Sequence, residues 1–423
     1  MIKTVLILAA LDTKWQEADF LSKQIQHRGY RTLLLDIGMK GEPGLYADIG
    51  REEILLASGE DPQGVAAIVD DRERVMSVVV RGAARILEEL YGQARIDGAV
   101  CLGGITGTRI GTSIMKSLPF GVPKLAISST ASLGGFASRY IGMSDITLSH
   151  SVVEFSGLND VLRNILAQAA GAICGMVDGA GEAPIAVQQE RPFVGMTQWG
   201  PCEVCATAVR HQLESKGYQV VGFPANGIGD RAMEEMIERQ GLFQAVIDLA
   251  PGGVGEELLG FSRAAGSSRL EAAGKRGIPQ IVAPSGVNFG TPLKAKYKPK
   301  YELRKKYDYD GLRTFIRLSN DELVMVATVM ARKLNRARGP VKVVIPLGGW
   351  SSVESRQTGF YDGEADRVFV DELKRRLSPN VEVMEIDSDL DTTDFAQAIV
   401  DIFERLCISS AVAAVESSTS VRS

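Results

Sequence analysis

The chain has few histidines and cysteines for its length. Its 423 residues include 3 His and 5 Cys. The cysteines are scattered and odd in number, which is not the pattern of a disulfide framework. No histidine stands in a setting typical of a catalytic triad, so nucleophilic hydrolysis lacks a visible base. The HExxH and GxSxG motifs and repeated metal-ligand spacings are also missing. The common hydrolase and metalloenzyme classes are therefore not favoured.

Long apolar runs and an excess of positive charge are lacking as well. No apolar run reaches about 18 residues, the length that suggests a membrane-spanning helix. The first predicted strand begins at Ile2, without the basic and apolar regions of a secretory signal. The formal net charge of −5 gives no overall attraction for nucleic acid. We therefore expect a cytoplasmic protein with neither a membrane nor a nucleic acid as its partner.

Glycine, in contrast, is abundant, with 45 residues, and its most informative turn lies within residues 99–111. An apolar run short enough for a buried strand breaks there into glycines and threonines and resumes as a predicted helix. Glycines let the backbone approach a ligand closely, and a helix N-terminus presents N–H groups to an anion. Because the turn matches neither GxGxxG nor GxxxxGK[ST], a tight turn without a ligand is the alternative. The candidate phosphate site comprises Gly103, Gly104, Thr106, Gly107 and Thr108.

The order of the apolar runs predicts an α/β fold with two domains. A chain of 423 residues exceeds one ordinary hydrophobic core. Continuous apolar runs such as residues 4–11 indicate parallel strands covered on both faces, and segments with helical spacing follow them. We expect α/β domains at residues 1–178 and 192–408, joined by a Gly- and Pro-bearing linker at 179–191 and followed by a flexible tail at 409–423.

The two halves share three features in the same order. Each has a Gly-Tyr pair before its second strand, beginning at Gly29 and at Gly217. Each then has a strand that runs into a double glycine, and a Gly-x-Pro triplet before the next strand. The predicted fold class is therefore two Rossmann-like domains with mainly parallel sheets, related by internal duplication, with a cleft between them.

Polar residues at other predicted strand ends extend the candidate site of the first half. Ligands of open parallel sheets bind at the carboxyl ends of the strands. Asp12 has an equal alternative as a helix N-cap, and the hydroxyl-rich loop after residue 128 has an alternative as a merely exposed loop. The added ligand-binding candidates are Asp12, Thr13, Ser129, Thr130, Ser144 and Asp145.

The second half has its own loops of glycine and polar residues at predicted strand ends. Such loops suit a phosphorylated or carboxylated ligand held between two facing α/β units. The substrate-binding candidates are Gly227, Gly229, Gly252, Gly253, Glu256, Asn288, Ser351 and Glu354.

Cys202 and Cys205 have CxxC spacing at a predicted helix start. A helix N-terminus would lower the pKa of the Cys202 thiol and make it reactive. The chain has no second CxxC pair for a zinc site, so redox or metal chemistry is the less favoured interpretation.

A basic run with interleaved tyrosines occupies residues 294–307. Such runs are usually solvated, and a contact with RNA or phosphate is the alternative.

The sequence resembles a known family over nearly its whole length. The matching motifs are spread along the chain and include residues 8–14, 102–104, 121–124, 231–234, 288–290 and 334–340. They resemble the bacterial and fungal homologues of the N-terminal, ATP-binding domain of the plant tobamovirus-resistance protein. The resemblance implies a two-domain α/β fold, nucleotide binding and a homodimer, and it carries over no reaction.

The resemblance also implies which residues hold the nucleotide. The residues carried over are Asp12, Thr13, Gly103, Gly104, Gly107, Thr108, Ser129, Thr130, Ser144 and Asp145. The chain departs from the family pattern in four places. Residues 250–254 replace a Thr-rich turn, and the segment before Asn288 is shortened. Ile105 and Thr106 replace a Ser-Gly pair, and residues 135–139 replace an Asp-Thr-Arg-Pro run.

Three functional hypotheses follow. The first is an ATP-binding protein that holds the phosphates on the 103–108 turn, with Mg²⁺ as a candidate cofactor. The second is a metabolic enzyme that acts on a small phosphorylated or carboxylated compound between the domains, through Asp12, Glu256, Asn288 and Glu354. The third is a protein- or RNA-binding module that uses the basic 294–306 flap. No catalytic residue is assigned.

Overall fold

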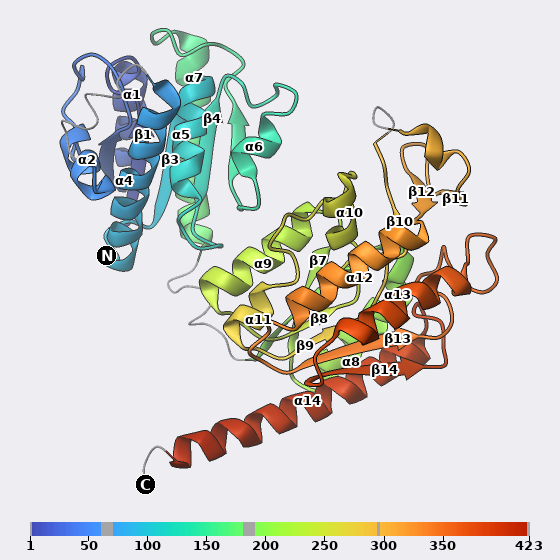
Figure 1. Cartoon of the computed structure of the whole chain (residues 1–423). Helices are drawn as coiled ribbons and strands as arrows, with labels where there is room; N and C mark the ends of the chain where they lie inside the picture. The colour runs from blue at the N-terminus through green and yellow to red at the C-terminus, as the bar shows by residue number, and fades with distance from the viewer. Residues whose placement is uncertain (1, 61–70, 181–190, 294–296, 421–423) are drawn as a thin grey trace. The chain divides into compact units, whose positions relative to one another are not determined.

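The computed structural model describes residues 2–60, 71–180, 191–293 and 297–420. The chain divides into two compact units, Met1–Gln188 (unit 1) and Gln189–Ser423 (unit 2), which Figure 1 shows in blue to green and in green to red. Nearly all of the predicted linker at residues 179–191 lies outside the described residues. Within them, no helix is long and apolar enough to cross a membrane.

Unit 1 is a five-stranded parallel sheet with helices on both faces (Figure 1). The strand order is β2-β1-β3-β4-β5. Helices α1 and α7 cover one face, and α4 and α5 pack together on the other. The elements are β1 (Thr4–Ala9), α1 (Trp15–Gln26), β2 (Arg31–Asp36), α2 (Arg51–Ser58), α4 (Arg72–Gly92), β3 (Gly98–Gly103), α5 (Ile105–Met115), β4 (Lys124–Ser128), α6 (Ala137–Ile141), β5 (Thr147–His150) and α7 (Asp160–Gly179).

The apolar runs of the sequence explain this layered arrangement. Every residue of β1 and of β3 is buried, because helices cover both faces of the sheet. The pairing of Leu8 with Cys101, and of Gly103 with Ser128, sets the ends of β1, β3 and β4 next to one another. The loops that follow these three strands therefore share one edge of the sheet.

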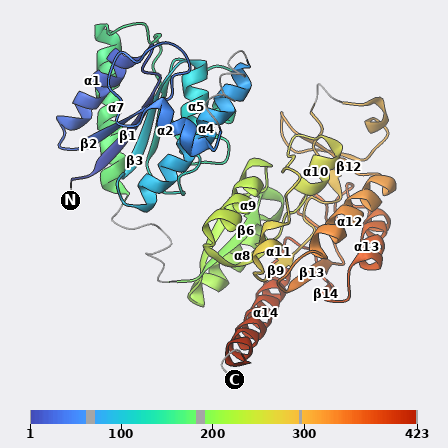
Figure 2. The ribbon, with the colours of Figure 1, turned by 60° about the vertical axis from the view of Figure 1, so that its left-hand side comes forward.

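Unit 2 has a six-stranded parallel sheet, ordered β14-β13-β9-β8-β6-β7, and a small antiparallel sheet, ordered β10-β12-β11. Helices α12 and α13 lie side by side in Figures 1 and 2 and are in contact. The elements are β6 (Phe193–Gln198), η1 (Gly200–Cys202), α8 (Glu203–Ser215), β7 (Gln219–Pro224), α9 (Ile228–Gln240), β8 (Phe243–Asp248), α10 (Gly253–Leu259), α11 (Ala272–Arg276), β9 (Gln280–Val282), β10 (Phe289–Gly290), η3 (Pro299–Tyr301), β11 (Lys306–Asp308), β12 (Thr314–Arg317), α12 (Asn320–Leu334), β13 (Val341–Pro346), α13 (Gly363–Arg376), β14 (Val381–Ile386) and α14 (Thr393–Ser420).

The predicted fold class is confirmed, because both main sheets are parallel and flanked by helices. The first four strands of the units also share one order, β2-β1-β3-β4 in unit 1 and β7-β6-β8-β9 in unit 2. The predicted cleft between the domains stays a prediction. The antiparallel sheet was not predicted, and part of the basic run at residues 294–307 forms its strand β11.

The end of the chain is helical, because α14 continues through Ser420. The continuation contains neither glycine nor proline, the two residues that most disfavour a helix. That residues 409–423 form a flexible tail stays a prediction.

Candidate functional site

A cavity of about 490 Å³ opens at the carboxyl edge of the unit 1 sheet. This is the edge where the loops after β1, β3 and β4 meet, and where ligands of open parallel sheets bind. Seven of the eleven nucleotide candidates line the cavity, namely Asp12, Thr13, Gly103, Gly104, Thr106, Gly107 and Thr130. The structure thus brings most of the predicted site together, and whether it binds a nucleotide stays a prediction.

The glycine turn lets helix α5 begin directly against the end of β3. Gly103 has a φ of +153°, and a Cβ there would lie 3.3 Å from the Cα of Gly107. A side chain at position 103 would therefore push the first turn of α5 away from the strand. The first amides of an α-helix have no acceptor within the helix. The amides that follow Gly104, the N-cap of α5, therefore lie beside the cavity as candidate anion donors.

Thr108 supports the turn from beneath and does not reach the cavity. It is fully buried, and its Oγ1 lies 2.7 Å from Ser128 Oγ and 3.1 Å from the carbonyl oxygen of Gly103. The hydroxyls continue from Ser128 to Thr130 (3.1 Å) and from Thr130 to Tyr140 (2.8 Å). The predicted phosphate contact of Thr108 is therefore corrected. Its hydroxyl holds the ends of β3 and β4 together.

Asp12 lines the cavity but is engaged by its own neighbours. Its Oδ2 accepts a hydrogen bond from the amide of Lys40 (3.1 Å) and lies 3.3 Å from Arg51 Nη2. Arg51 also pairs with Asp36 at 2.7 Å. Asp12 does not cap α1, whose N-cap residue is Lys14. The carboxylate of Asp12 therefore positions the loop at residues 38–41, which forms one wall of the cavity.

Ser144 and Asp145 lie away from the cavity, contrary to the prediction. Asp145 pairs with Lys124 Nζ (2.6 Å) and accepts a hydrogen bond from the amide of Gly121 (2.7 Å). Lys124 is the first residue of β4, so both pairs belong to the opposite, amino end of the strands. The Ser-Asp pair was placed by its nearness in sequence to the hydroxyl loop. The crossover through α6 returns the chain to the amino edge, because β5, which is parallel to β4, begins just after Asp145.

Four charged residues of the cavity were missed by the sequence analysis. Lys14, Lys40, Arg72 and Glu154 line it with the glycine turn. Arg72 Nη2 donates to Thr106 Oγ1 (2.7 Å), and Glu154 Oε1 accepts from Ser129 Oγ (3.1 Å). These residues come from a helix and loops far from the turn in sequence. No local motif marks them.

The equivalent glycine turn of unit 2 is covered by its own chain. Gly252 and Gly253 are buried, and a Cβ on Gly252 would lie 2.1 Å from the carbonyl oxygen of Gly286. Glu256 is buried and pairs with Arg263 (2.8 Å) while it accepts from the amide of Thr291 (2.8 Å). The prediction that these residues contact a substrate is corrected, because the loops of unit 2 already occupy the space that a ligand would need.

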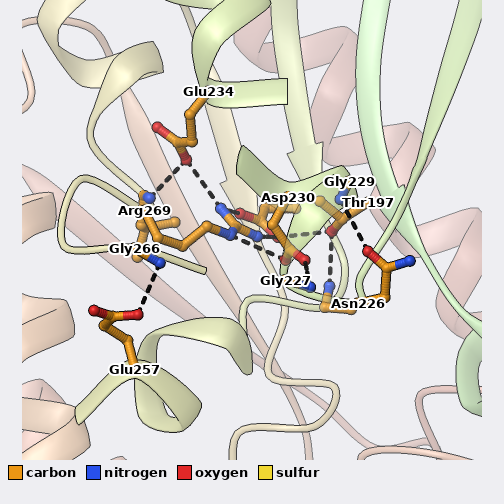
Figure 3. Close-up of polar contacts among 12 residues, drawn as sticks. Thr197, Asn226, Gly227, Gly229, Asp230, Glu234, Glu257, Gly266 and Arg269 are labelled. Atoms are coloured by element: carbon orange, nitrogen blue, oxygen red, sulfur yellow. Dashed lines mark hydrogen bonds and ion pairs between the residues drawn. The ribbon is translucent and has the colours of Figure 1, made fainter. Parts of the chain in front are cut away.

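Arg269 lies at the carboxyl edge of the unit 2 sheet, where it contacts several carboxylates (Figure 3). It is fully buried and lies 2.6 Å from Asp248, 3.1 Å from Asp230 and 3.1 Å from Glu234. Thr197 donates to Asp248 from the end of β6 (2.7 Å). Burial raises the pKa of Asp230 and of Glu234, and the nearby guanidinium opposes that rise. We name Arg269 and these three carboxylates the Arg269 network.

Gly227 and Gly229 belong to the start of α9 beside the Arg269 network, as Figure 3 shows. The amide of Gly227 donates to Asp230 Oδ2 (2.7 Å), and the amide of Gly229 donates to Asn226 Oδ1 (2.9 Å). Both amides are therefore satisfied by side chains of the same loop. The predicted substrate contacts of the two glycines are corrected to a capping role.

Asn288 and Glu354, both predicted for substrate binding, meet in a buried cluster with Arg317 and Asp366. Asn288 Nδ2 donates to Glu354 Oε2 (3.0 Å) and to Asp366 Oδ1 (2.8 Å). Arg317 lies 3.1 Å from Glu354 and 2.5 Å from Asp366. We name these four residues the Asn288 cluster. They tie the loop after β13 to α13 and to the antiparallel sheet.

The Asn288 cluster is closed to solvent and holds more acid than base. Each of its residues is at least nine-tenths buried, as is the neighbouring candidate Ser351. Burial, with the charge of Asp366, raises the pKa of Glu354 to about 8, and burial also raises the pKa of Asp366. The two carboxyl groups therefore retain a proton at neutral pH. Asn288, Ser351 and Glu354 are corrected from substrate contacts to interior residues.

Most of the basic flap's cations that the structure describes are paired with carboxylates of unit 2. Lys300 and Arg304 pair with Glu322 (3.3 and 2.5 Å), and Lys305 pairs with Asp362 (3.2 Å). Residues 294–296 lie outside the described part of the chain. Paired cations attract a polyanion weakly, so this arrangement gives no support to the RNA-binding hypothesis.

The CxxC pair is part of the core. Cys202 and Cys205 are fully buried, and burial raises the pKa of Cys202 to about 12 and that of Cys205 well above its ordinary value. The expected lowering by the helix N-terminus is therefore outweighed by desolvation. Among the described residues, no group of three or more His, Cys, Asp or Glu side chains could hold a metal ion.

Native protein should react slowly at these two thiols. Thiolate is the reactive form, and two buried thiols of raised pKa supply very little of it at neutral pH. Labelling with iodoacetamide at pH 7.5, followed by peptide mass spectrometry, should modify Cys202 and Cys205 only after denaturation. Cys407 is partly exposed, and burial raises its pKa to about 11, so it should react slowly but ahead of the two core thiols and serves as the internal comparison. Rapid native labelling at Cys202 would restore the redox interpretation.

Comparison with known proteins adds the family context. Residues 3–182 match the N-terminal domain, and residues 191–407 the C-terminal domain, of the uncharacterised protein family UPF0261. A UPF0261 protein of Clostridium tetani is 34% identical over 403 residues, which cover 94% of this chain and 98% of that protein. The ToMV susceptible protein tm-1(GCR26) of Solanum lycopersicum is 30% identical over 420 residues, which cover 94% of this chain and 55% of that protein.

Similarity to solved structures is slight. UDP-N-acetylglucosamine 2-epimerase from Rickettsia bellii is 9% identical, with a TM-score of 0.23, over 66% of this chain and 79% of the epimerase chain. Similarity at this level does not indicate a shared activity.

Proposed function

The chain belongs to the UPF0261 family, and from this premise we propose that unit 1 binds a nucleotide, with ATP as the first candidate. The phosphates would lie on the Gly103–Gly107 turn and the first amides of α5. ATP is the nucleotide that the resemblance to the tobamovirus-resistance family implies. A homodimer and a cytoplasmic location are further proposals from the same resemblance and from the composition.

The cavity of unit 1 is the observation that supports this proposal. Its volume of about 490 Å³ falls in the range of small-molecule sites, roughly 300–1,000 Å³. One part of the lining is apolar and suits a base, with Ile37, Met39 and Ile110. The other part combines the helix N-terminus with Arg72, a residue type that pairs with phosphate oxygens. The lining therefore offers apolar contacts for a base as well as donors for phosphates.

The alternative function is an enzyme with its substrate between the domains. Most of the residues proposed to bind that substrate are not accessible to a ligand. Glu256, Asn288 and Glu354 are buried in unit 2 and satisfied there by other side chains or amides. Of that set, Asp12 lines the unit 1 cavity. The geometry favours a ligand held within unit 1 alone.

Arg72→Gln should weaken ATP binding about 10- to 100-fold, because the variant loses a charge-assisted contact worth about 1.5–3 kcal/mol. Isothermal titration calorimetry of the full chain with ATP and with adenosine would measure the effect. Adenosine has no phosphate, so its affinity should change little.

Arg74→Gln is the matched control, because Arg74 is an exposed residue of the same helical turn that does not line the cavity. Equal loss in the two variants would point to a general charge effect. No heat and no thermal shift with wild-type protein and millimolar ATP would refute nucleotide binding in unit 1.

A further inference from the structure

A carboxylate lies beside the proposed phosphate site. Glu154 lines the cavity, and Ser129 holds its Oε1 by a hydrogen bond of 3.1 Å. A Cβ placed on Gly104, the N-cap of α5, would lie 4.0 Å from Glu154 Oε2. A free phosphate at this turn would therefore meet a like charge at short range. At an effective dielectric constant near 20 such repulsion is large enough to change an affinity severalfold.

A cation lies at the same turn. The guanidinium of Arg72 donates a hydrogen bond of 2.7 Å to Oγ1 of Thr106, which lies in the first turn of α5. The next residue of α4, Glu73, forms a paired hydrogen bond with Arg109 of α5 (2.6 and 2.7 Å). This pair fixes the start of α4 against α5 and so holds Arg72 in place. The glycine turn is thus bounded by both a guanidinium and a carboxylate.

Two further cations, Lys14 and Lys40, line the cavity, and Lys14 Nζ donates to the carbonyl oxygen of Phe155. Among the described residues, none of these cations lies within ion-pair distance of Glu154, whose hydrogen-bond partner is Ser129. Phosphate oxygens suit the cations and the helix amides, whereas Glu154 suits a cation on the ligand. Mg²⁺ in nucleotide sites is typically held by one or two carboxylates, phosphate oxygens and water. The described residues hold no group of three or more ligating side chains, so a metal ion would have to arrive with the nucleotide.

We propose that the cavity selects the magnesium complex of the nucleotide, with Glu154 on the metal side and Arg72 on the phosphate side. This inference rests on the proposed nucleotide binding. It adds that Glu154 makes the cavity bind the magnesium complex of the nucleotide in preference to the metal-free nucleotide. Ser129, which was predicted to touch the nucleotide, acts in this assignment as the residue that orients Glu154.

Calorimetry with the full chain tests the assignment. ATP is titrated in excess MgCl₂ and again in EDTA, into wild-type protein, Glu154→Gln and Glu88→Gln. Glu88 is exposed on α4 and does not line the cavity, so it controls for the loss of one negative charge. Wild type and Glu88→Gln should bind ATP about tenfold or more tightly with magnesium than without it. In Glu154→Gln this advantage should fall below about threefold, because metal-free ATP no longer meets the carboxylate.

The possible outcomes distinguish a failure of the role assigned to Glu154 from a failure of the proposed nucleotide binding. A Glu154→Gln variant that keeps the full magnesium advantage would overturn the role of Glu154 and leave nucleotide binding intact. Equal weakening with and without magnesium would show a purely structural role and would also overturn it. If wild-type protein binds ATP under neither condition, the proposed function itself is wrong. A thermal melt of each variant without ligand checks that the fold is unchanged.

Discussion

Arg269→Met should destabilise unit 2 by about 3–5 kcal/mol, which is the usual cost of removing one partner from a buried ion pair. Arg269 is fully buried among Asp230, Glu234 and Asp248. Without the guanidinium, the three carboxyl groups would have to bind protons or remain charged in the interior. Because a typical domain is stable by only about 5–15 kcal/mol, a loss of this size is a large fraction of the total.

The matched control for this substitution is Arg332→Met. Arg332 is exposed on α12, where the same change of side chain should cost less than about 0.5 kcal/mol. Hydrogen exchange measured peptide by peptide in urea would report each unit separately, which a single unfolding curve of two units does not. The loss of protection should be confined to unit 2. Adding Asp248→Asn to Arg269→Met should recover part of the stability, because it removes one of the orphaned charges.

An Arg269→Met variant with wild-type protection in unit 2 would show that the network contributes little to the fold. The covered edge of this sheet would then need another explanation, such as the packing of the loop at residues 284–287 alone.

The Arg269 network explains why two similar glycine turns have different surroundings. The sequence predicted both the 103–104 turn and the 252–253 turn as ligand sites, because each follows a buried strand. Around the second turn, Arg263 and Arg269 of the loop between α10 and α11 pair with Glu256 of α10 and Asp248 of β8, which holds that loop over the strand ends. In unit 1 no equivalent cover was found among the described residues, and a cavity lies there. The strand-to-glycine pattern therefore locates the edge of a sheet but does not show whether that edge is open.

The strands were the most predictable part of the molecule. A run such as residues 5–9 of β1 is continuously apolar because helices cover both faces of the sheet, a pattern typical of a buried parallel strand. The side chains around the cavity were less predictable. Arg72 and Glu154 are placed by the packing of α4 on α5 and by the path of the chain after β5, and neither is encoded in a local spacing. Asp145 shows the converse error, because nearness in sequence placed it at the wrong end of β4.

The Asn288 cluster should make the stability of unit 2 fall as the pH rises. The pKa of Glu354 is about 8 in the folded protein, whereas an unperturbed glutamate has a pKa of 4.5. The folded state therefore holds a proton that the unfolded state releases between these values. The stabilisation is complete below about pH 4.5 and is lost progressively up to about pH 8. The slope is at most about 1.4 kcal/mol per pH unit, so the total is a few kcal/mol. The raised pKa of Asp366 acts in the same direction.

Glu354→Gln should flatten this profile, because a glutamine amide resembles the protonated acid and does not titrate. At pH 5 the variant should be about as stable as wild type, and at pH 8.5 it should be more stable by about 1–3 kcal/mol. Urea unfolding from pH 5 to pH 9, followed by hydrogen exchange in residues 341–376, measures the difference. Glu238→Gln, at an exposed position on α9, should keep the wild-type slope. Parallel profiles for wild type and Glu354→Gln would mean that Glu354 is ionised in the folded protein. Arg317 would then balance the charge of both carboxylates, and the cluster would hold no proton at neutral pH.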